Sequence, residues 1–196
     1  MARGRPRTFD RDTALAQATR LFWERGYGAT SVGELTAAMG IRPASLYAAF
    51  GDKKSLFEEV VAAHNRTTAG SFIDAALTEE STARDTFARI LRDAAEIYAD
   101  PSHPAGCMII NAAVNVTPQD TEIAERLREI RNANLAAFET RLAAGRDAGE
   151  LPPDTDTRVL ARYFAAVLQG MSQQARDGAT ARELGEVAEQ ALRTWP

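Results

Sequence analysis

The sequence SVGELTAAMGIRPASLYAAF, residues 31–50, predicts two short helices joined by a tight turn. Ser31 and Glu34 have the spacing of a capping box, in which the serine oxygen and the glutamate carboxylate each bind a free backbone N–H at the helix start. Gly40 marks the turn, and Pro43 suits the first position of the next helix because its missing N–H would be unpaired there. Two short helices joined in this way form a helix-turn-helix.

A longer helix is expected just before this motif. Asp10 is a good N-cap, apolar residues then recur at three- and four-residue steps, and Gly26 ends the pattern. In a helix-turn-helix, the N-terminal part of the second short helix enters the major groove of DNA. Leu46 and Phe50 can face the core, which leaves four residues to reach phosphates or base edges: Arg42, Pro43, Ser45 and Tyr47. The alternative is an ordinary helical hairpin in which Tyr47 is half-buried.

The helix that follows adds a second indication of DNA binding. Asp52 can cap it, which places Lys53 and Lys54 in its first turn, and these are the only two lysines in the chain. Positive side chains at a helix N-terminus oppose the helix dipole. A phosphate lying there would accept hydrogen bonds from the backbone and from an ammonium group.

Charge is divided unevenly along the chain. Residues 1–54 hold nine basic and five acidic residues, whereas residues 55–196 hold 14 basic and 22 acidic residues. A basic segment on an acidic body is expected when one end of a protein meets a polyanion and the rest does not.

The composition is that of an ordinary globular protein: 196 residues, 45% hydrophobic and 26% charged. Sustained period-two alternation is absent, so we expect an all-α fold of about nine helices, six of them near 53–78, 83–99, 105–116, 119–148, 155–176 and 180–195. No apolar run approaches the roughly 18 residues of a membrane span, and the start lacks a signal-peptide pattern, so a cytoplasmic location is expected. The single cysteine, Cys107, excludes an intrachain disulfide.

The N-terminal residues resemble the TetR/AcrR family of bacterial transcriptional regulators. The similarity lies in GYGATSV, residues 26–32, and GIRPASLYAAFGDK, residues 40–53, with a looser pattern from Asp154 through Gly170 to Trp195. It implies a DNA-binding domain at 10–52 and an effector-binding and dimerisation domain at 53–196, which leaves a basic arm at 1–9. By motif position, it also implies operator contacts by Thr30, Arg42, Pro43, Ser45, Tyr47 and Lys53. Arg42 departs from the family pattern, because a small hydroxyl residue usually stands there, so the helix cap is expected to be lost.

The arm carries three arginines around a Gly-Arg-Pro core. Arg3, Arg5 and Arg7 form an extended, thin segment that suits the narrow minor groove of A·T-rich DNA. The alternative is a solvated tail.

Two apolar stripes near the C-terminus are candidates for a homodimer interface, as the resemblance implies. Each stripe could instead be core within one chain. The stripes contain Leu160, Phe164, Val167, Leu168, Met171, Leu184, Val187 and Leu192.

A small-molecule effector site is expected around the apolar segment 107–115, which contains two amides. Because the segment has no charge cluster, we expect an uncharged or weakly polar ligand. Ordinary core or capping roles are the alternative for every candidate: Tyr98, Cys107, Asn111, Asn115, Phe138, Tyr163 and Gln169.

The sequence thus predicts a DNA-binding repressor released by a small effector, with no cofactor and no membrane partner. One alternative is a thiol- or metal-responsive regulator acting through Cys107, although an inert buried thiol is the simpler interpretation. Another is an architectural DNA-binding protein without an effector. Enzymatic activity is not expected, because P-loop, dinucleotide, zinc-protease and nucleophile-elbow motifs are absent.

Overall fold

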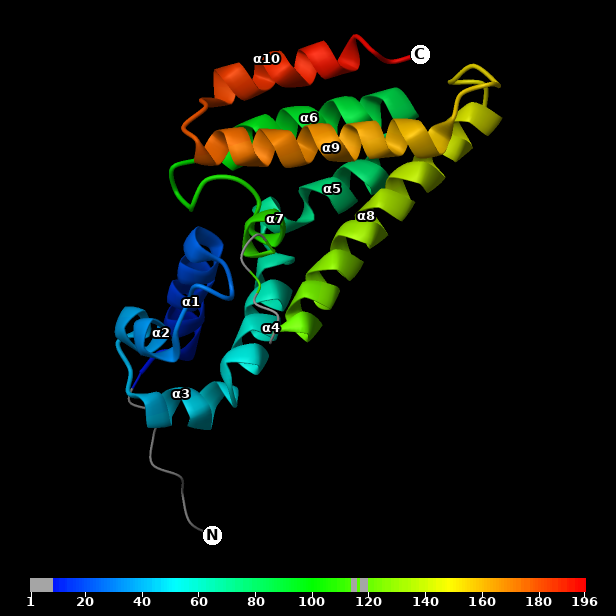
Figure 1. Ribbon diagram of the computed structural model, residues 1–196. Coiled ribbons are helices and arrows are strands. Elements are labelled where there is room, and N and C mark those ends of the chain that lie inside the picture. Colours follow the sequence, from blue (N-terminus) through cyan, green and yellow to red (C-terminus); the bar gives the residue numbers. More distant parts are fainter. Residues whose placement is uncertain (1–8, 114–115, 117–119) are drawn as a thin grey trace.

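The computed structural model describes residues 9–113, 116 and 120–196, and these form ten α-helices and no strand (Figure 1). The predicted all-α fold is therefore confirmed. The helices are α1 Arg11–Arg25, α2 Val32–Met39, α3 Pro43–Phe50, α4 Lys53–His64, α5 Thr68–Glu79, α6 Ala83–Ala99, α7 Met108–Ala112, α8 Thr121–Asp147, α9 Thr157–Arg176 and α10 Ala181–Leu192.

The N-terminal helices begin and end as the sequence predicts. The Asp10 carboxylate accepts a hydrogen bond from Thr13 N at 2.7 Å, and both bonds of the Ser31–Glu34 capping box are present. Gly40 has a φ of 64°, a left-handed conformation that glycine adopts without strain, and it turns the chain from α2 into α3. Arg42 occupies the N-cap position of α3, but its side chain makes no hydrogen bond to the helix start. The predicted loss of a side-chain cap is therefore confirmed.

The expected helix 53–78 is wrong, because the chain breaks there into α4 and α5. The Thr67 hydroxyl accepts a hydrogen bond from Gly70 N and donates one to the His64 carbonyl, so it both starts α5 and binds the last carbonyl groups of α4. A threonine with this capping geometry ends one helix and begins another. The expected helix 105–116 is also too long, since α7 spans only Met108–Ala112.

Two hydrophobic clusters form the core. The first packs α1, α2 and α3 against α4 and also includes residues of α7 and the start of α8, with Phe22, Phe57 and Leu127 among its members. The second joins α5, α6, α8, α9 and α10. The predicted domain boundary at residue 52 lies inside the first cluster, since Leu56 and Val60 of α4 pack with the N-terminal helices.

Figure 1 shows how the two clusters are arranged. Helix α3 lies at one end of the molecule and α10 at the other, with α4 and the long α8 running between them. None of the described helices is long and apolar enough to cross a membrane.

Candidate nucleic-acid interface and ligand cavity

Helix α3 presents one polar face to solvent. Leu46 and Phe50 are buried, as predicted, whereas Arg42 and Pro43 are exposed and Tyr47 is 51% exposed. Ser45 is half-buried. The side chains predicted to read DNA therefore lie at the start of one short, accessible helix, although their contacts with DNA stay predictions.

Sequence reasoning did not single out Ala44 and Ala48, which are also exposed on α3 beside Tyr47. Alanine has no hydrogen-bonding side chain, so nothing marked these positions as contacts. Their small size allows the helix backbone to approach a groove closely, and an alanine methyl can pack on the thymine methyl.

The structure does not bring Thr30 to the surface. Its side chain is fully buried, and its hydroxyl donates a hydrogen bond of 2.8 Å to the Gly26 carbonyl. The predicted operator contact of Thr30 is thus not supported by its position, because the interior hydrogen bond fixes the hydroxyl away from solvent.

The two lysines of α4 have different partners. The Lys53 ammonium lies 4.1 Å from the centre of the Tyr27 ring, and burial lowers the pKa of Lys53. Lys54 forms an ion pair with Glu122 of α8. Because Lys54 is engaged by a carboxylate, Lys53 is the better candidate for the expected phosphate site, and the carboxylates of Asp120 and Glu34 also act on its charge. Arg3, Arg5 and Arg7 lie outside the described residues.

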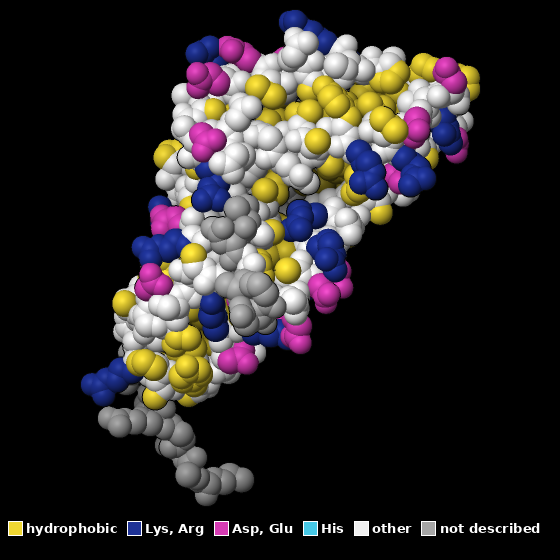
Figure 2. Space-filling model, in the orientation of Figure 1, with side chains coloured by type: hydrophobic (Ala, Val, Ile, Leu, Met, Phe, Trp, Pro, Cys, Tyr) yellow, Lys and Arg dark blue, Asp and Glu magenta, His cyan; other side chains and the backbone are white. Residues whose placement is uncertain are grey.

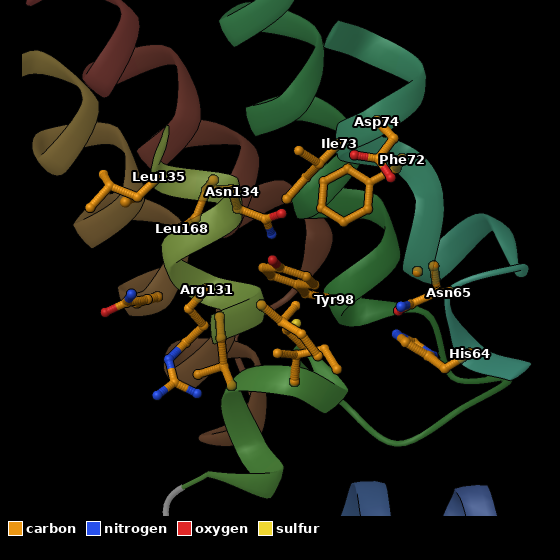
Figure 3. Close-up of a pocket in the computed structure, with 18 of the residues that line it drawn as sticks. His64, Asn65, Phe72, Ile73, Asp74, Tyr98, Arg131, Asn134, Leu135 and Leu168 are labelled. Carbon is orange, nitrogen blue, oxygen red and sulfur yellow. The ribbon is translucent and has the colours of Figure 1, made fainter. Parts of the chain in front are cut away.

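A cavity of about 120 Å³ lies between the end of α4 and helices α5 to α9 (Figure 3). Phe72, Ile73, Leu135, Phe138 and Leu168 supply apolar walls. Polar side chains also line it: His64, Asn65, Asp74, Tyr98, Arg131, Asn134 and Gln169. The site is an apolar chamber with scattered polar groups, which is the usual character of a small-molecule site.

Four predicted ligand residues line this cavity, namely Tyr98, Cys107, Phe138 and Gln169. Two others do not. Asn111 is buried and its amide donates a hydrogen bond of 2.9 Å to the Ala105 carbonyl, so it holds the loop before α7. Tyr163 is 37% exposed on the outer face of α9. Asn115 lies outside the described residues.

The residues missed in the sequence come mainly from α5 and α8. Ile73, Arg131 and Asn134 line the cavity, but each sits in a helix whose other polar residues face solvent. Arg131 in particular follows Arg126 and Arg128, which pair with Glu129 and Glu125 as surface charges. Nothing in the local pattern distinguishes an inward arginine from these neighbours.

Burial controls the titration of the cavity walls. It lowers the pKa of His64 to about 4, with a smaller contribution from His103, so the imidazole is neutral near pH 7. Burial also raises the pKa of the Cys107 thiol, partly offset by hydrogen bonds from the Ile110 and Ile109 backbone. The thiol is therefore protonated near neutral pH, which is the less reactive form.

Aromatic contacts connect the cavity to α1. His64 lies edge-on to Trp23, with ring centroids 4.8 Å apart, and His103 stacks on the same indole at 4.4 Å. The Trp23 indole N–H donates a hydrogen bond of 3.2 Å to the Gly106 carbonyl, next to Cys107. His64, the last residue of α4, lines the cavity, whereas Val60 and Val61 of the same helix do not.

Most of the predicted dimer stripe is core within one chain. Phe164, Leu168, Met171, Leu184 and Leu192 are buried in the cluster that joins α5, α6, α8, α9 and α10. Leu160, Val167 and Val187 are half-buried. The apolar stripe seen in the sequence therefore marks mainly the inward faces of α9 and α10. The outward face of α9 is formed by the residues next to this stripe.

That outward face is unusually apolar. Val159 is 63% exposed and Tyr163 is 37% exposed, and these two with Tyr47 are the large hydrophobic residues exposed in the described part of the chain. Ala166 and Gly170 continue the exposed row along α9. Figure 2 shows hydrophobic side chains gathered over α9 and α10 at the end of the molecule opposite α3.

Within residues 9–113, 116 and 120–196, no group of three or more His, Cys, Asp or Glu side chains is placed to hold a metal ion. Cys107, the candidate thiol or metal sensor of the sequence analysis, is thus not part of such a group in the described chain.

Comparisons with known proteins agree with this geometry. The family model of bacterial regulatory proteins of the tetR family matches residues 14–60, and the model of the tetracyclin repressor-like C-terminal domain matches residues 83–191. The chain is 34% identical to the HTH-type transcriptional repressor ComR of Escherichia coli K12 over 195 residues, which cover 100% of this chain and 93% of ComR. It is 30% identical to the repressor BdcR of the same strain, over 96% of this chain and 90% of BdcR.

A solved structure shows the same fold on DNA. It holds a cysteine-substituted variant of the TetR family transcriptional regulator CifR with a 26-base-pair operator duplex. It matches with a TM-score of 0.91 and 41% identity, and the match covers 98% of this chain and 100% of that one.

Proposed function

The chain belongs to the TetR family of bacterial transcriptional regulators, and from this premise we propose that it represses transcription as a homodimer that leaves its operator when a small molecule fills the cavity. The chain has a DNA-binding helix-turn-helix, and its relatives include repressors and a regulator bound to operator DNA.

The proposed DNA contacts come from α3 and the start of α4. Arg42, Ser45 and Tyr47 reach base edges or phosphates in the major groove, and Lys53 binds a phosphate. Support comes from their shared location at one end of the molecule, because Arg42 and Tyr47 are exposed on α3, Ser45 is half-buried between them, and Lys53 begins the next helix. In such a complex, Lys53 would exchange part of its contact with Tyr27 for a phosphate.

The proposed dimer interface is the outward face of α9 with the neighbouring surface of α10. Val159, Tyr163 and Ala166 would pack against their symmetry mates, and Val187 would extend the contact on α10. A two-fold contact of this kind uses the same patch on both subunits and places two recognition helices on successive half-sites.

One observation carries the regulatory proposal: α4 has Lys53 at its first residue and His64 at its last. The first end belongs to the candidate DNA surface, and the second lines the cavity and contacts Trp23 of α1. A ligand that prefers a shifted His64 would therefore move the orientation of α1 and α4 together. Without such a preference between two conformations, the ligand would change nothing.

The experiment begins with an operator selected from a random duplex library, followed by a thermal-shift screen of small molecules and a DNA-release assay with each hit. Release by a ligand whose binding is weakened by Phe138→Ala supports the proposal. A protein that selects no duplex, or hits that bind in the cavity without releasing DNA, would contradict it.

The same assays test the two alternatives. If release requires an oxidant or a metal ion and disappears in Cys107→Ser, the switch lies at the thiol. If no condition releases the DNA, an architectural role replaces the regulatory one. The raised pKa of Cys107 favours the small-molecule proposal over the thiol switch.

A further inference from the structure

Arg131 of α8 lines the cavity with one unpaired guanidinium nitrogen. Its Nη1 atom is buried and makes no hydrogen bond, and it is the only buried side-chain nitrogen or oxygen in this condition among the described residues. Arg141 of the same helix, by contrast, donates to the Thr86 hydroxyl and the Ser81 carbonyl. Buried polar groups without partners are rare, and each one needs an explanation.

Among the described residues, no acidic side chain is found to act on this guanidinium. The charged and titratable groups acting on Arg131 are Arg128, which repels it, and the Cys107 thiol, while burial lowers the pKa of Arg131. Asp74 is the only carboxylate among the described residues that line the cavity, and Figure 3 shows it on the α5 side, across the chamber from Arg131 on α8. The cavity therefore has a positive end without a counter-ion in the described chain.

We propose that the effector is a small carboxylate whose anionic end binds Arg131 and whose apolar body lies against Phe72, Leu135 and Leu168. This inference rests on the proposed function, because it names the chemical class of the ligand that the cavity takes. The planar guanidinium binds a carboxylate through two parallel hydrogen bonds, a geometry that an alcohol or ether does not match. It replaces the uncharged ligand expected from the apolar segment 107–115.

The size of the chamber limits the body of the ligand. A volume of about 120 Å³ is close to that of an engineered cavity of roughly 150 Å³ that holds benzene. A carboxylate with one ring or a short branched chain fits such a space, whereas a long acyl chain does not. Asp74 at the opposite side disfavours a dicarboxylate by charge repulsion.

The test compares benzoate with benzamide, which has nearly the same shape without the charge. We expect benzoate to raise the melting temperature and bind in calorimetry, and benzamide to bind at least tenfold more weakly. In Arg131→Met, benzoate affinity should fall by roughly ten- to hundredfold, which is the range for losing a hydrogen bond to a charged group. Arg128→Met, on the same helix but at the surface, should bind benzoate like the parent.

A second measurement does not depend on the ligand. Because Arg131→Met removes an unsatisfied buried group and keeps an unbranched side chain, the unliganded variant should be at least as thermally stable as the parent. A less stable variant would overturn the assignment of Arg131 as an unpaired group, since it would reveal a stabilising partner.

The outcomes separate this inference from the proposed function. Equal binding of benzoate and benzamide, or of benzoate to the parent and Arg131→Met, overturns the carboxylate site while leaving regulation by a neutral ligand intact. Arg131-dependent binding of benzoate that releases no operator DNA supports the site and contradicts the proposed switch. Absence of benzoate binding at millimolar concentration, together with absence of binding by its ring-saturated and short branched analogues, also overturns the site.

Discussion

The imidazole of His64 stands edge-on to the indole of Trp23, with ring centroids 4.8 Å apart and ring planes at 82°. His64 ends α4 and forms part of the cavity wall, whereas Trp23 belongs to α1 and donates its indole N–H to the Gly106 carbonyl. The pair thus joins the cavity, the loop before α7 and the first helix of the DNA-binding end. Because the two rings are in direct contact, a displacement of His64 in the cavity wall can displace Trp23, and with it α1.

The first prediction is that His64→Ala weakens the coupling between ligand and DNA. The variant keeps the α3 surface, so its operator affinity in the absence of ligand should stay within about threefold of the parent. The ratio of operator affinities with and without a saturating ligand should fall several-fold, since coupling energies of this kind usually lie near 1–3 kcal/mol. Fluorescence anisotropy with a labelled operator measures both quantities.

His103→Ala is the matched control for this experiment. His103 stacks on Trp23 at 4.4 Å but does not line the cavity. It should leave the ratio unchanged. If both histidine variants reduce the ratio equally, the coupling depends on the packing of histidine rings against Trp23 and not on the contact of His64 with the cavity.

The second prediction concerns pH. The folded-state pKa of His64 is about 4, below its ordinary value of 6.5, so the unfolded chain binds the proton first as the pH falls. The stability that depends on neutral His64 is therefore complete above pH 6.5 and is lost progressively down to about pH 4. The full loss is about 3 kcal/mol, from a pKa difference of this size.

The measurement is the free energy of unfolding in urea at several pH values between 7.5 and 4.5. Carboxylates also titrate in this range, so the informative quantity is the difference between the parent and His64→Gln. We expect the parent to lose more stability than the variant on acidification. Parallel pH profiles would show that His64 titrates normally in the folded protein.

The third prediction assigns Lys53 to a phosphate. Lys53→Met keeps an aliphatic stem over Tyr27 and removes the charge, so the fold should persist while binding weakens on every duplex alike. If one phosphate contact is lost, the slope of log affinity against log salt concentration should become shallower by about 0.9. The burial that raises the pKa of Tyr27 to about 12 keeps its ring uncharged throughout the assay.

Lys54→Met provides the comparison, because the Lys54 ammonium is already paired with Glu122. Its salt slope should change less than that of Lys53→Met. A Lys53 variant with an unaltered slope would show that the ammonium serves only its contact with Tyr27.

Local signals in the sequence were sufficient for the DNA-binding end. The cap at Asp10, the capping box at Ser31 and the proline at position 43 each act within four residues, so their hydrogen bonds could be read before the fold was known. The break between α4 and α5 is also local, because Thr67 supplies the cap, but the apolar periodicity on both sides predicts one continuous helix.

The cavity and the dimer face depend on distant packing and could not be predicted in this way. Periodicity marks the apolar face of α9 correctly, but it does not say whether that face meets α6 or a second subunit, and Phe164 meets the former. Similarly, Arg131 differs from Arg128 only in which side of α8 faces the cavity, and that depends on how α8 crosses α5 and α7.

The fourth prediction tests the proposed dimer interface. Tyr163→Glu places a charge at the centre of the exposed apolar row on α9 without entering the core. We expect a folded monomer by light scattering and at least tenfold weaker operator binding, because a dimer holds two half-sites at once. Thr78→Glu, an exposed position on α5, should remain dimeric. A dimeric Tyr163→Glu protein would move the interface elsewhere.

The fifth prediction concerns Gly70, where α5 begins directly over the end of α4. A Cβ atom at this position would lie 2.1 Å from the His64 carbonyl oxygen and 2.8 Å from the Asn65 Cα. Both are backbone atoms, so they cannot rotate away, and Gly70→Ala must push the two helices apart. Overpacking of this kind costs typically 1–3 kcal/mol and here should reach the upper end of that range. The displaced segment includes His64, so the variant should also lose part of its ligand response at temperatures where it remains folded.

Gly33→Ala is the control, since the nearest atom to its added Cβ is the Ser31 Oγ at 3.9 Å, and it should be as stable as the parent or slightly more stable. Denaturant titration of both variants decides the matter: equal stability of the two would mean that α4 and α5 can separate at that point without cost.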